Sequence, residues 1–155
     1  MRSKFDFLLD KLTRCDAWYS GIHGHDHWMR VVENGLDIAN HTPGVDKTVV
    51  ELFGLLHDTQ RWGDGEDRYH GPRAAEFLDK IVNELHITEK QYELLRYAIE
   101  HHTDELHNSD PTIGACYDSD RLDLGRVGKA PNPDYLNTNY AKSLAPYAFI
   151  DEVDE

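Results

Sequence analysis

The chain has few cysteines and no long apolar segment, and both absences limit what it can be. Its two cysteines, Cys15 and Cys116, lie far apart and form no CxxC pair, so we expect two free thiols. No apolar run approaches the ~20 residues that a membrane-spanning helix needs. The N-terminal stretch 1–14 lacks the apolar region and cleavage site of a signal peptide. We therefore expect a cytoplasmic protein with no membrane association.

Positive charge is also scarce. The chain has 16 Lys and Arg against 29 Asp and Glu, for a net charge of −13. Long nucleic acids and anionic membrane surfaces bind basic patches, so this charge disfavours both as partners. A small phosphorylated substrate is still possible, because a bound metal can reverse the local field. The oligomeric state is left open.

The 155 residues suit one domain, 1–155, with a single sizeable core. No segment alternates as a strand would, whereas apolar residues recur at helical spacing almost throughout. The pattern predicts an all-α fold, a compact single-domain helical bundle of about six or seven helices. A central buried helix is expected within 46–60. Beyond Gly128 the chain is rich in Pro and Asn, so we expect 129–155 to be an extension packed on the surface, with a short helix around Tyr140–Leu144.

Ten histidines are the most informative feature, and several ionisable residues fall on the apolar faces of the expected helices. His57 follows Phe53 by four residues, and His102 follows Ile99 by three. His27 and Asp120 lie on comparable faces of two other helices. Burying each such group without a partner costs on the order of several kcal/mol. A shared metal ion offsets that cost, since imidazole nitrogens and carboxylate oxygens can bind it.

Each of these residues also has an ordinary explanation. A single buried histidine usually makes one satisfied hydrogen bond, and Asp120 could pair with Arg121 or Arg126. The metal hypothesis therefore depends on the four helical positions occurring together.

Three segments in order resemble the motifs of the HD-domain metal-dependent phosphohydrolases. "HWMRV" (27–31) is similar to the first-histidine motif, "LLHDTQ" (55–60) to the His-Asp motif, and "DSDRLDLGRVG" (118–128) to the final aspartate motif. The resemblance covers about 20–128 and implies an all-helical fold. It also implies a metal site formed by His27, His57, Asp58 and Asp120, in which His57 and Asp58 are the catalytic pair. Asp118 and Asp123 compete with Asp120, and the motif favours Asp120.

Some families of this type hold a second metal, and "YHGPR" with "IEHHTDE" resembles their additional histidines. The second metal would then bind Asp58, His70, His101 and also His102. In the alternative, one metal is present and His70 and His101 bind substrate phosphate directly. The cofactor is one or two divalent metal ions, with Mn, Fe, Mg, Zn, Ni and Co all open.

Contacts to the substrate are harder to place. His23 precedes the first expected ligand, and we predict it to contact substrate together with Arg30, Arg61 and Arg73. Surface or structural roles for each arginine remain open. Some related hydrolases carry an acidic residue soon after the His-Asp pair for acid–base chemistry, whereas this chain has Thr59, Gln60 and Arg61. Asp64, Glu66 or Asp67 could substitute, or a metal-bound water could need no protein base; the role of His25 is open.

The resemblance implies an enzyme, a hydrolase acting on phosphoester bonds. The expected substrate is a small phosphorylated compound, such as a nucleotide or related phosphoester, attacked by metal-activated water. Two alternatives stay open: an HD-type di-iron oxygenase acting on a small polyol or phosphonate, and a non-catalytic metal-dependent nucleotide sensor.

Overall fold

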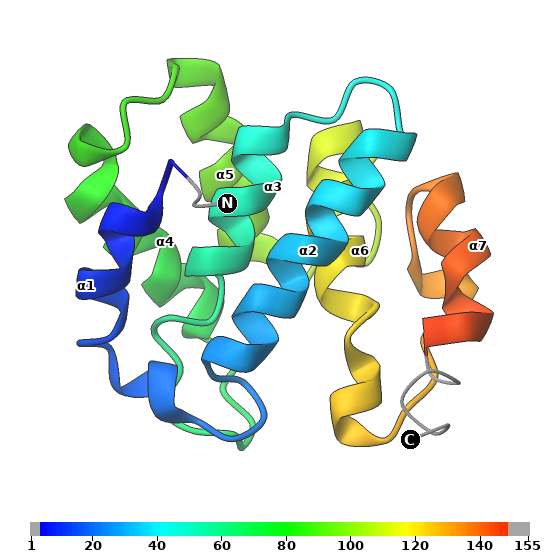
Figure 1. The fold of residues 1–155 in the computed structure, drawn as a ribbon, viewed down its shortest axis with the longest axis horizontal. Coiled ribbons are helices and arrows are strands. Elements are labelled where there is room, and N and C mark those ends of the chain that lie inside the picture. Colours follow the sequence, from blue (N-terminus) through cyan, green and yellow to red (C-terminus); the bar gives the residue numbers. More distant parts are fainter. Residues whose placement is uncertain (1–3, 149–155) are drawn as a thin grey trace.

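The computed structural model describes residues 4–148, and every regular element in that range is helical (Figure 1). The all-α prediction is confirmed. The helices are α1 (Leu9–Leu12), α2 (His25–His41), α3 (Lys47–Leu56), α4 (His70–Ile81), α5 (Glu89–His101), α6 (Pro111–Arg121) and α7 (Asn139–Ala148). Short 3-10 helices occur beside several of them.

Capping residues set several of the helix boundaries. Thr88 and Gln91 form a reciprocal capping box at the start of α5. Asp110 accepts from the backbone of α6, which has proline at its first position. α3 ends at Leu56, earlier than the expected segment 46–60, although His57 keeps a helical backbone conformation as its C-cap.

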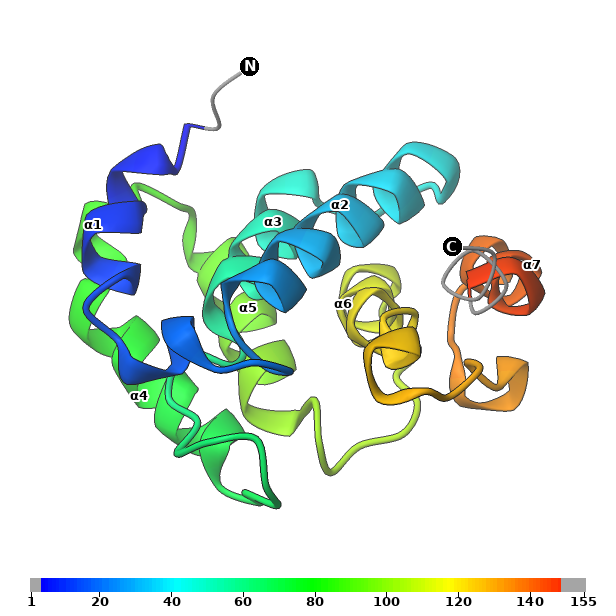
Figure 2. The same ribbon diagram turned by 60° about the horizontal axis from the view of Figure 1, so that its bottom comes forward.

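α3 is the centre of the bundle, as its apolar sequence predicts. It packs against α2, α5 and α6, and α4 packs on the far side of α5 (Figures 1 and 2). Its buried side chains include Val49, Val50, Leu52, Phe53, Leu55 and Leu56. α1 and α4 lie at one end of the molecule and α7 lies at the other.

Two glycines allow neighbouring helices to approach closely. A Cβ at Gly54 of α3 would lie 2.8 Å from the backbone nitrogen of Val32 in α2. A Cβ at Gly71 of α4 would lie 2.7 Å from the carbonyl oxygen of Glu100 in α5. Real side chains do not tolerate such distances, so glycine at each position fixes the spacing of one helix pair.

Segments on both sides of 20–128 contribute to the same core. Leu8 and Leu12 are fully buried near the N-terminus, and Leu136, Ala141 and Ala145 are buried in the described part of the C-terminal extension. The short helix expected around Tyr140–Leu144 is α7, while 149–155 lie outside the described residues.

Within residues 4–148, no helix has the length and apolarity needed to span a bilayer. The helical arrangement is compatible with an HD-like fold.

Candidate metal centre

Six side chains from five helices meet at one end of the bundle. The start of α2 and the ends of α3 and α6 lie toward the same end (Figure 1). These elements, with the start of α4 and the end of α5, supply His27, His57, Asp58, His70, His102 and Asp120. The helix termini therefore bring together residues up to 93 positions apart by sequence number, from 27 to 120.

The first group contains four atoms that could bind one metal ion. His27 Nε2 lies 3.1 Å from His57 Nε2, 3.3 Å from Asp58 Oδ2 and 3.1 Å from Asp120 Oδ1. His57 Nε2 lies 3.5 Å from each of the same two carboxylate oxygens. Two imidazoles and two carboxylates form a donor set that several divalent transition metals accept.

The second group shares Asp58 with the first. The other oxygen of that carboxylate, Oδ1, lies 3.1 Å from His70 Nε2 and 3.6 Å from His102 Nε2. The two imidazole nitrogens are 3.0 Å apart. Asp58 therefore presents one oxygen to each group, which is the arrangement of a bridging ligand.

The opposite edge of each clustered histidine is already committed to an oxygen acceptor. His27 Nδ1 lies 2.7 Å from Asp123 Oδ2, and His57 Nδ1 lies 3.1 Å from the carbonyls of Phe53 and Gly54. His70 Nδ1 lies 2.6 Å from the Asp67 carbonyl, and His102 Nδ1 lies 2.7 Å from the Ile99 carbonyl. Since these acceptors carry no proton, each Nδ1 donates one. A neutral ring then has a lone pair at Nε2.

This arrangement fits a bound cation. Lone pairs on His27 and His57 face each other and face carboxylate oxygens, and the same holds for His70 and His102 beside Asp58. In addition, Asp120 Oδ1 is buried and, while His27 and His57 are neutral, accepts no hydrogen bond from residues 4–148. Metal ions in the two groups would satisfy these electron pairs, and the oriented rings are typical of metal-binding histidines.

In the metal-free chain, a proton substitutes in part for the cation. Burial alone would lower the pKa of His27, but Asp120, Asp123 and Asp58 raise the pKa of this imidazole to about 10. Burial also opposes ionisation of Asp58 and Asp120, yet the neighbouring histidines hold both carboxyl pKa values well below the ordinary value. Both carboxylates are therefore ionised and ready to bind a metal at neutral pH.

His101 is the one predicted ligand that the structure does not bring to the cluster. Its Nδ1 lies 3.1 Å from Asp104 Oδ1, and its ring packs on Tyr97. His102 takes the expected position instead, because it follows Ile99 on the buried face of α5. Adjacent residues on a helix point about 100° apart, so only one of the pair can face the cluster.

The three aspartates near the end of α6 have separate positions. Asp120 faces the first group, in agreement with the motif. Asp118 is fully buried on another face, where it accepts hydrogen bonds from Asn137 and Thr138. Asp123 contacts the outer nitrogen of His27 and also accepts from Arg30 Nε at 2.7 Å. The role of Asp123 in orienting His27 was not predicted from the sequence.

The predicted substrate contacts divide into two sets. His23 and Arg61 border the cluster: the ring of His23 lies 6.1 Å from that of His27, and Arg61 Nε lies 3.8 Å from Asp58 Oδ1. Arg30 contacts Asp123 behind His27. Arg73, in the first turn of α4, packs against the preceding loop, where it contacts Gln60, Asp67 and the ring of Trp62.

Arg126 was considered from the sequence as an ion-pair partner of Asp120 but not as a residue that handles substrate. Arg126 lies in the 3-10 helix Leu124–Val127, which follows α6, and its Nη2 is 3.9 Å from Asp120 Oδ1. The only signal was its place in the final motif. His25, by contrast, points away from the cluster: it stacks on Trp18, and its Nδ1 contacts the Trp18 carbonyl.

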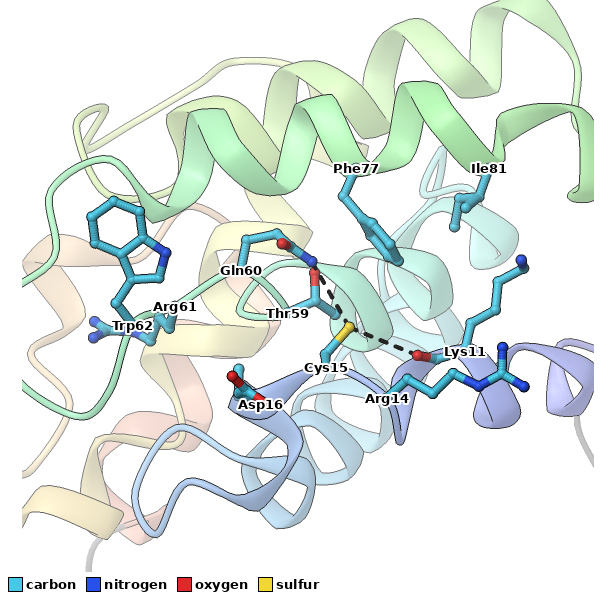
Figure 3. A pocket seen from close by; sticks show the side chains of 11 residues that line it. Lys11, Arg14, Cys15, Asp16, Thr59, Gln60, Arg61, Trp62, Phe77 and Ile81 are labelled. Atoms are coloured by element: carbon cyan, nitrogen blue, oxygen red, sulfur yellow. Dashed lines mark hydrogen bonds between the residues drawn. The ribbon is translucent and has the colours of Figure 1, made fainter.

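Two cavities flank the loop that follows Asp58. One, of about 490 Å³, is lined by Lys11 and Cys15 from the N-terminal segment, by Phe77 of α4, which faces them in Figure 3, and by Thr59, Gln60 and Arg61. The second, of about 530 Å³, is lined by Arg61, Tyr69 and Thr103 and includes the ligand candidate His70. The second cavity therefore adjoins the metal cluster, and Arg61 borders both.

Comparisons with models of protein families, with curated proteins and with solved structures find no match for this chain. Its function is therefore inferred from the residues and geometry of the cluster.

Proposed function

We propose that this protein is an HD-type phosphohydrolase that uses two divalent metal ions to hydrolyse a small phosphorylated compound, such as a nucleotide or related phosphoester. The observation that carries this proposal is Asp58, whose two oxygens each face a pair of histidines. Paired metal sites of this kind are suited to displacement at phosphorus.

The chain's own residues divide between holding the metals and handling the substrate. His27, His57, Asp58 and Asp120 would hold the first ion, and Asp58, His70 and His102 the second. Bound divalent ions supply Lewis-acid charge and an acidified water nucleophile. His57 and Asp58 would thus contribute to catalysis by holding the metal ions. Asp123 orients His27, and backbone carbonyl acceptors orient the other three imidazole rings.

His23 is suited to move a proton at the edge of the cluster. Asp64 accepts from the backbone of His23 and lies 3.1 Å from its Nδ1, so the carboxylate fixes the ring and its tautomer. The pKa of His23 is lowered by burial, so the ring is neutral and Nε2 keeps a lone pair that can accept a proton from an attacking water. This arrangement offers an acid–base group where Thr59 and Gln60 replace the expected acidic residue. His23→Gln should lower kcat more than it raises KM; an unchanged kcat would exclude this role.

The donor set also bears on the metal. Four imidazoles and two carboxylates favour Mn, Fe, Co, Ni or Zn over Mg, which prefers oxygen ligands. The same set is compatible with iron, and so with the oxygenase alternative. Arg61 beside Asp58 favours an anionic substrate, which disfavours an oxygenase acting on a polyol but does not separate the phosphohydrolase from one acting on a phosphonate.

The proposal is tested by phosphate release under anaerobic conditions, with the metal-loaded protein screened against nucleotides and sugar phosphates. We expect release that chelation abolishes, that Asp58→Ala eliminates and that the control His101→Ala retains. Turnover that requires iron and consumes oxygen would identify the oxygenase instead. Tight nucleotide binding with no turnover across several metals would identify a sensor.

A further inference from the structure

Two arginines beside the cluster each donate hydrogen bonds from Nη1 and keep a buried Nε atom that has no hydrogen-bond partner within the described part of the chain. Arg61 Nη1 donates to the carbonyls of Gly63 and Gly65 at 3.2 and 2.8 Å. Arg126 Nη1 donates to the Asp123 carbonyl at 2.7 Å. Both Nε atoms are buried, and no residue in 4–148 accepts a hydrogen bond from either. Since buried N–H groups are nearly always hydrogen-bonded, we expect the Nε–H groups of both arginines to donate to a bound ligand.

The arginines flank opposite ends of the proposed metal pair. Arg61 Nε lies 3.8 Å from the Asp58 oxygen that faces His70 and His102. Arg126 Nη2 lies 3.9 Å from the Asp120 oxygen that faces His27 and His57. Both distances are too long for a hydrogen bond. The carboxylates therefore attract the guanidinium groups without satisfying their N–H donors.

Arg61 and Arg126 both place a positive charge at the edge of the histidine–aspartate cluster. Arg61 follows α3, and Arg126 lies in the 3-10 helix that follows α6, so two separate segments bring positive charge to the edge of the cluster. Burial and then these two charges lower the pKa of His23, whereas Asp58 and Asp64 oppose the shift. The side chains of Arg61 and Arg126 are only 12% and 11% exposed, which limits the solvent available to their Nε–H groups.

We propose that Arg61 and Arg126 form a clamp for the terminal phosphate of the substrate, and that the substrate is a phosphomonoester rather than a phosphodiester. This inference rests on the proposed function and specifies its substrate class. Arg126 thereby becomes a substrate-binding residue alongside Arg61.

Donor geometry and charge favour the monoester. The Nε and Nη2 edge of an arginine is a planar fork that matches two phosphate oxygens. Two such forks suit a terminal phosphate, which offers three non-ester oxygens, better than a diester, which offers two. Asp58 and Asp120 neutralise only half the charge of two divalent ions, and the arginines add to the excess. A dianionic monoester offsets more of it than a monoanionic diester does.

The test is calorimetric binding of inorganic phosphate to manganese-loaded protein, with dimethyl phosphate as the diester analogue. Wild type should bind phosphate at least ten times more tightly than dimethyl phosphate. Arg61→Met and Arg126→Met should each weaken phosphate binding at least tenfold, and Arg126→Lys should lie between, because it keeps the charge and loses the fork. The control Arg96→Met removes an arginine that pairs with Asp79 and Glu100. It should stay within twofold of wild type.

The metal content of every variant is measured at the same time. Wild-type phosphate affinity in both methionine variants would overturn the clamp, as would equal binding of the two anions. Loss of metal from Arg61→Met or Arg126→Met would also count against it, because the arginine would then support the metal ligands. Arginine-dependent phosphate binding without hydrolysis would support the clamp and refute the phosphohydrolase. Hydrolysis with no dependence on either arginine would do the reverse.

Discussion

Asp118 and Asp120 are two residues apart in α6, and their environments assign them different roles. Asp118 accepts backbone and side-chain hydrogen bonds from Asn137 and Thr138, so it holds the C-terminal extension on the bundle. Asp120 turns an unpaired oxygen toward His27 and His57. One aspartate therefore stabilises the fold, and the other is available for metal binding.

Replacing each of these aspartates by asparagine should separate stability from function. Asp118→Asn should lower the free energy of unfolding by about 2–3 kcal/mol, since it weakens hydrogen bonds to a buried charge. Asp120→Asn should greatly reduce metal content and activity, which Asp118→Asn should leave largely intact; it should also cost stability in the metal-free protein, because Asp120 helps to hold the His27 proton. Denaturant unfolding and elemental analysis measure the two effects. The reverse assignment of losses would show that the wrong aspartate has been placed in the metal site.

At the scale of helices, two close contacts control the two halves of the site. Gly54 lets α3 approach α2; His57 follows the end of α3, and His27 lies in the first turn of α2. Gly71 lets α4 approach α5; His70 begins α4, and His102 follows the end of α5. Each glycine therefore sets the spacing of one histidine pair through the packing of its helices.

Alanine at either glycine should damage one metal group more than the other. We expect Gly54→Ala to weaken binding of the first metal and Gly71→Ala that of the second, each with a stability loss of about 1–3 kcal/mol because the added methyl meets backbone atoms. Metal titration of the folded variants measures this. Equal loss of both metals in both variants would show that helix spacing does not act on the groups separately.

The elements also show how far the sequence could predict the site. Helical periodicity located the helices, and the spacing of His27, His57, Asp58 and Asp120 indicated residues that do come together. Periodicity placed His102 on the buried face, three residues after Ile99, whereas His101 was predicted from the family resemblance alone, and the structure does not bring it to the cluster. The positions of Asp123 and Arg126 depend on how the chain turns after α6, and no local pattern specifies that turn.

At the scale of the whole molecule, metal binding by the histidine–aspartate cluster is linked to the release of a proton. The pKa of His27, about 10 in the metal-free fold, exceeds its ordinary value of 6.5. Protonated His27 therefore stabilises the metal-free fold fully below pH 6.5, and this contribution is lost as pH rises through about 10. Asp58 and Asp120 have depressed pKa values and stay ionised over this range. A metal in the first group must therefore displace the His27 proton.

Metal affinity should consequently rise with pH from neutral to about 10, with nearly one proton released for the first metal bound. Calorimetry in two buffers with different ionisation enthalpies measures the released protons. His27→Gln should remove this proton release along with tight binding at the first group. Metal binding to wild type that is independent of pH and releases no proton would contradict the electrostatic account.

The central claim is that Asp58 joins two metal ions, one held with His27 and His57 and the other with His70 and His102. Its most direct test is the metal-to-protein ratio of wild type, His102→Ala and His101→Ala after manganese loading. We predict a ratio of about two for wild type, about one for His102→Ala and about two for His101→Ala, because removing a ligand weakens the metal that it contacts. A ratio of one in wild type that His102→Ala leaves unchanged would contradict the account.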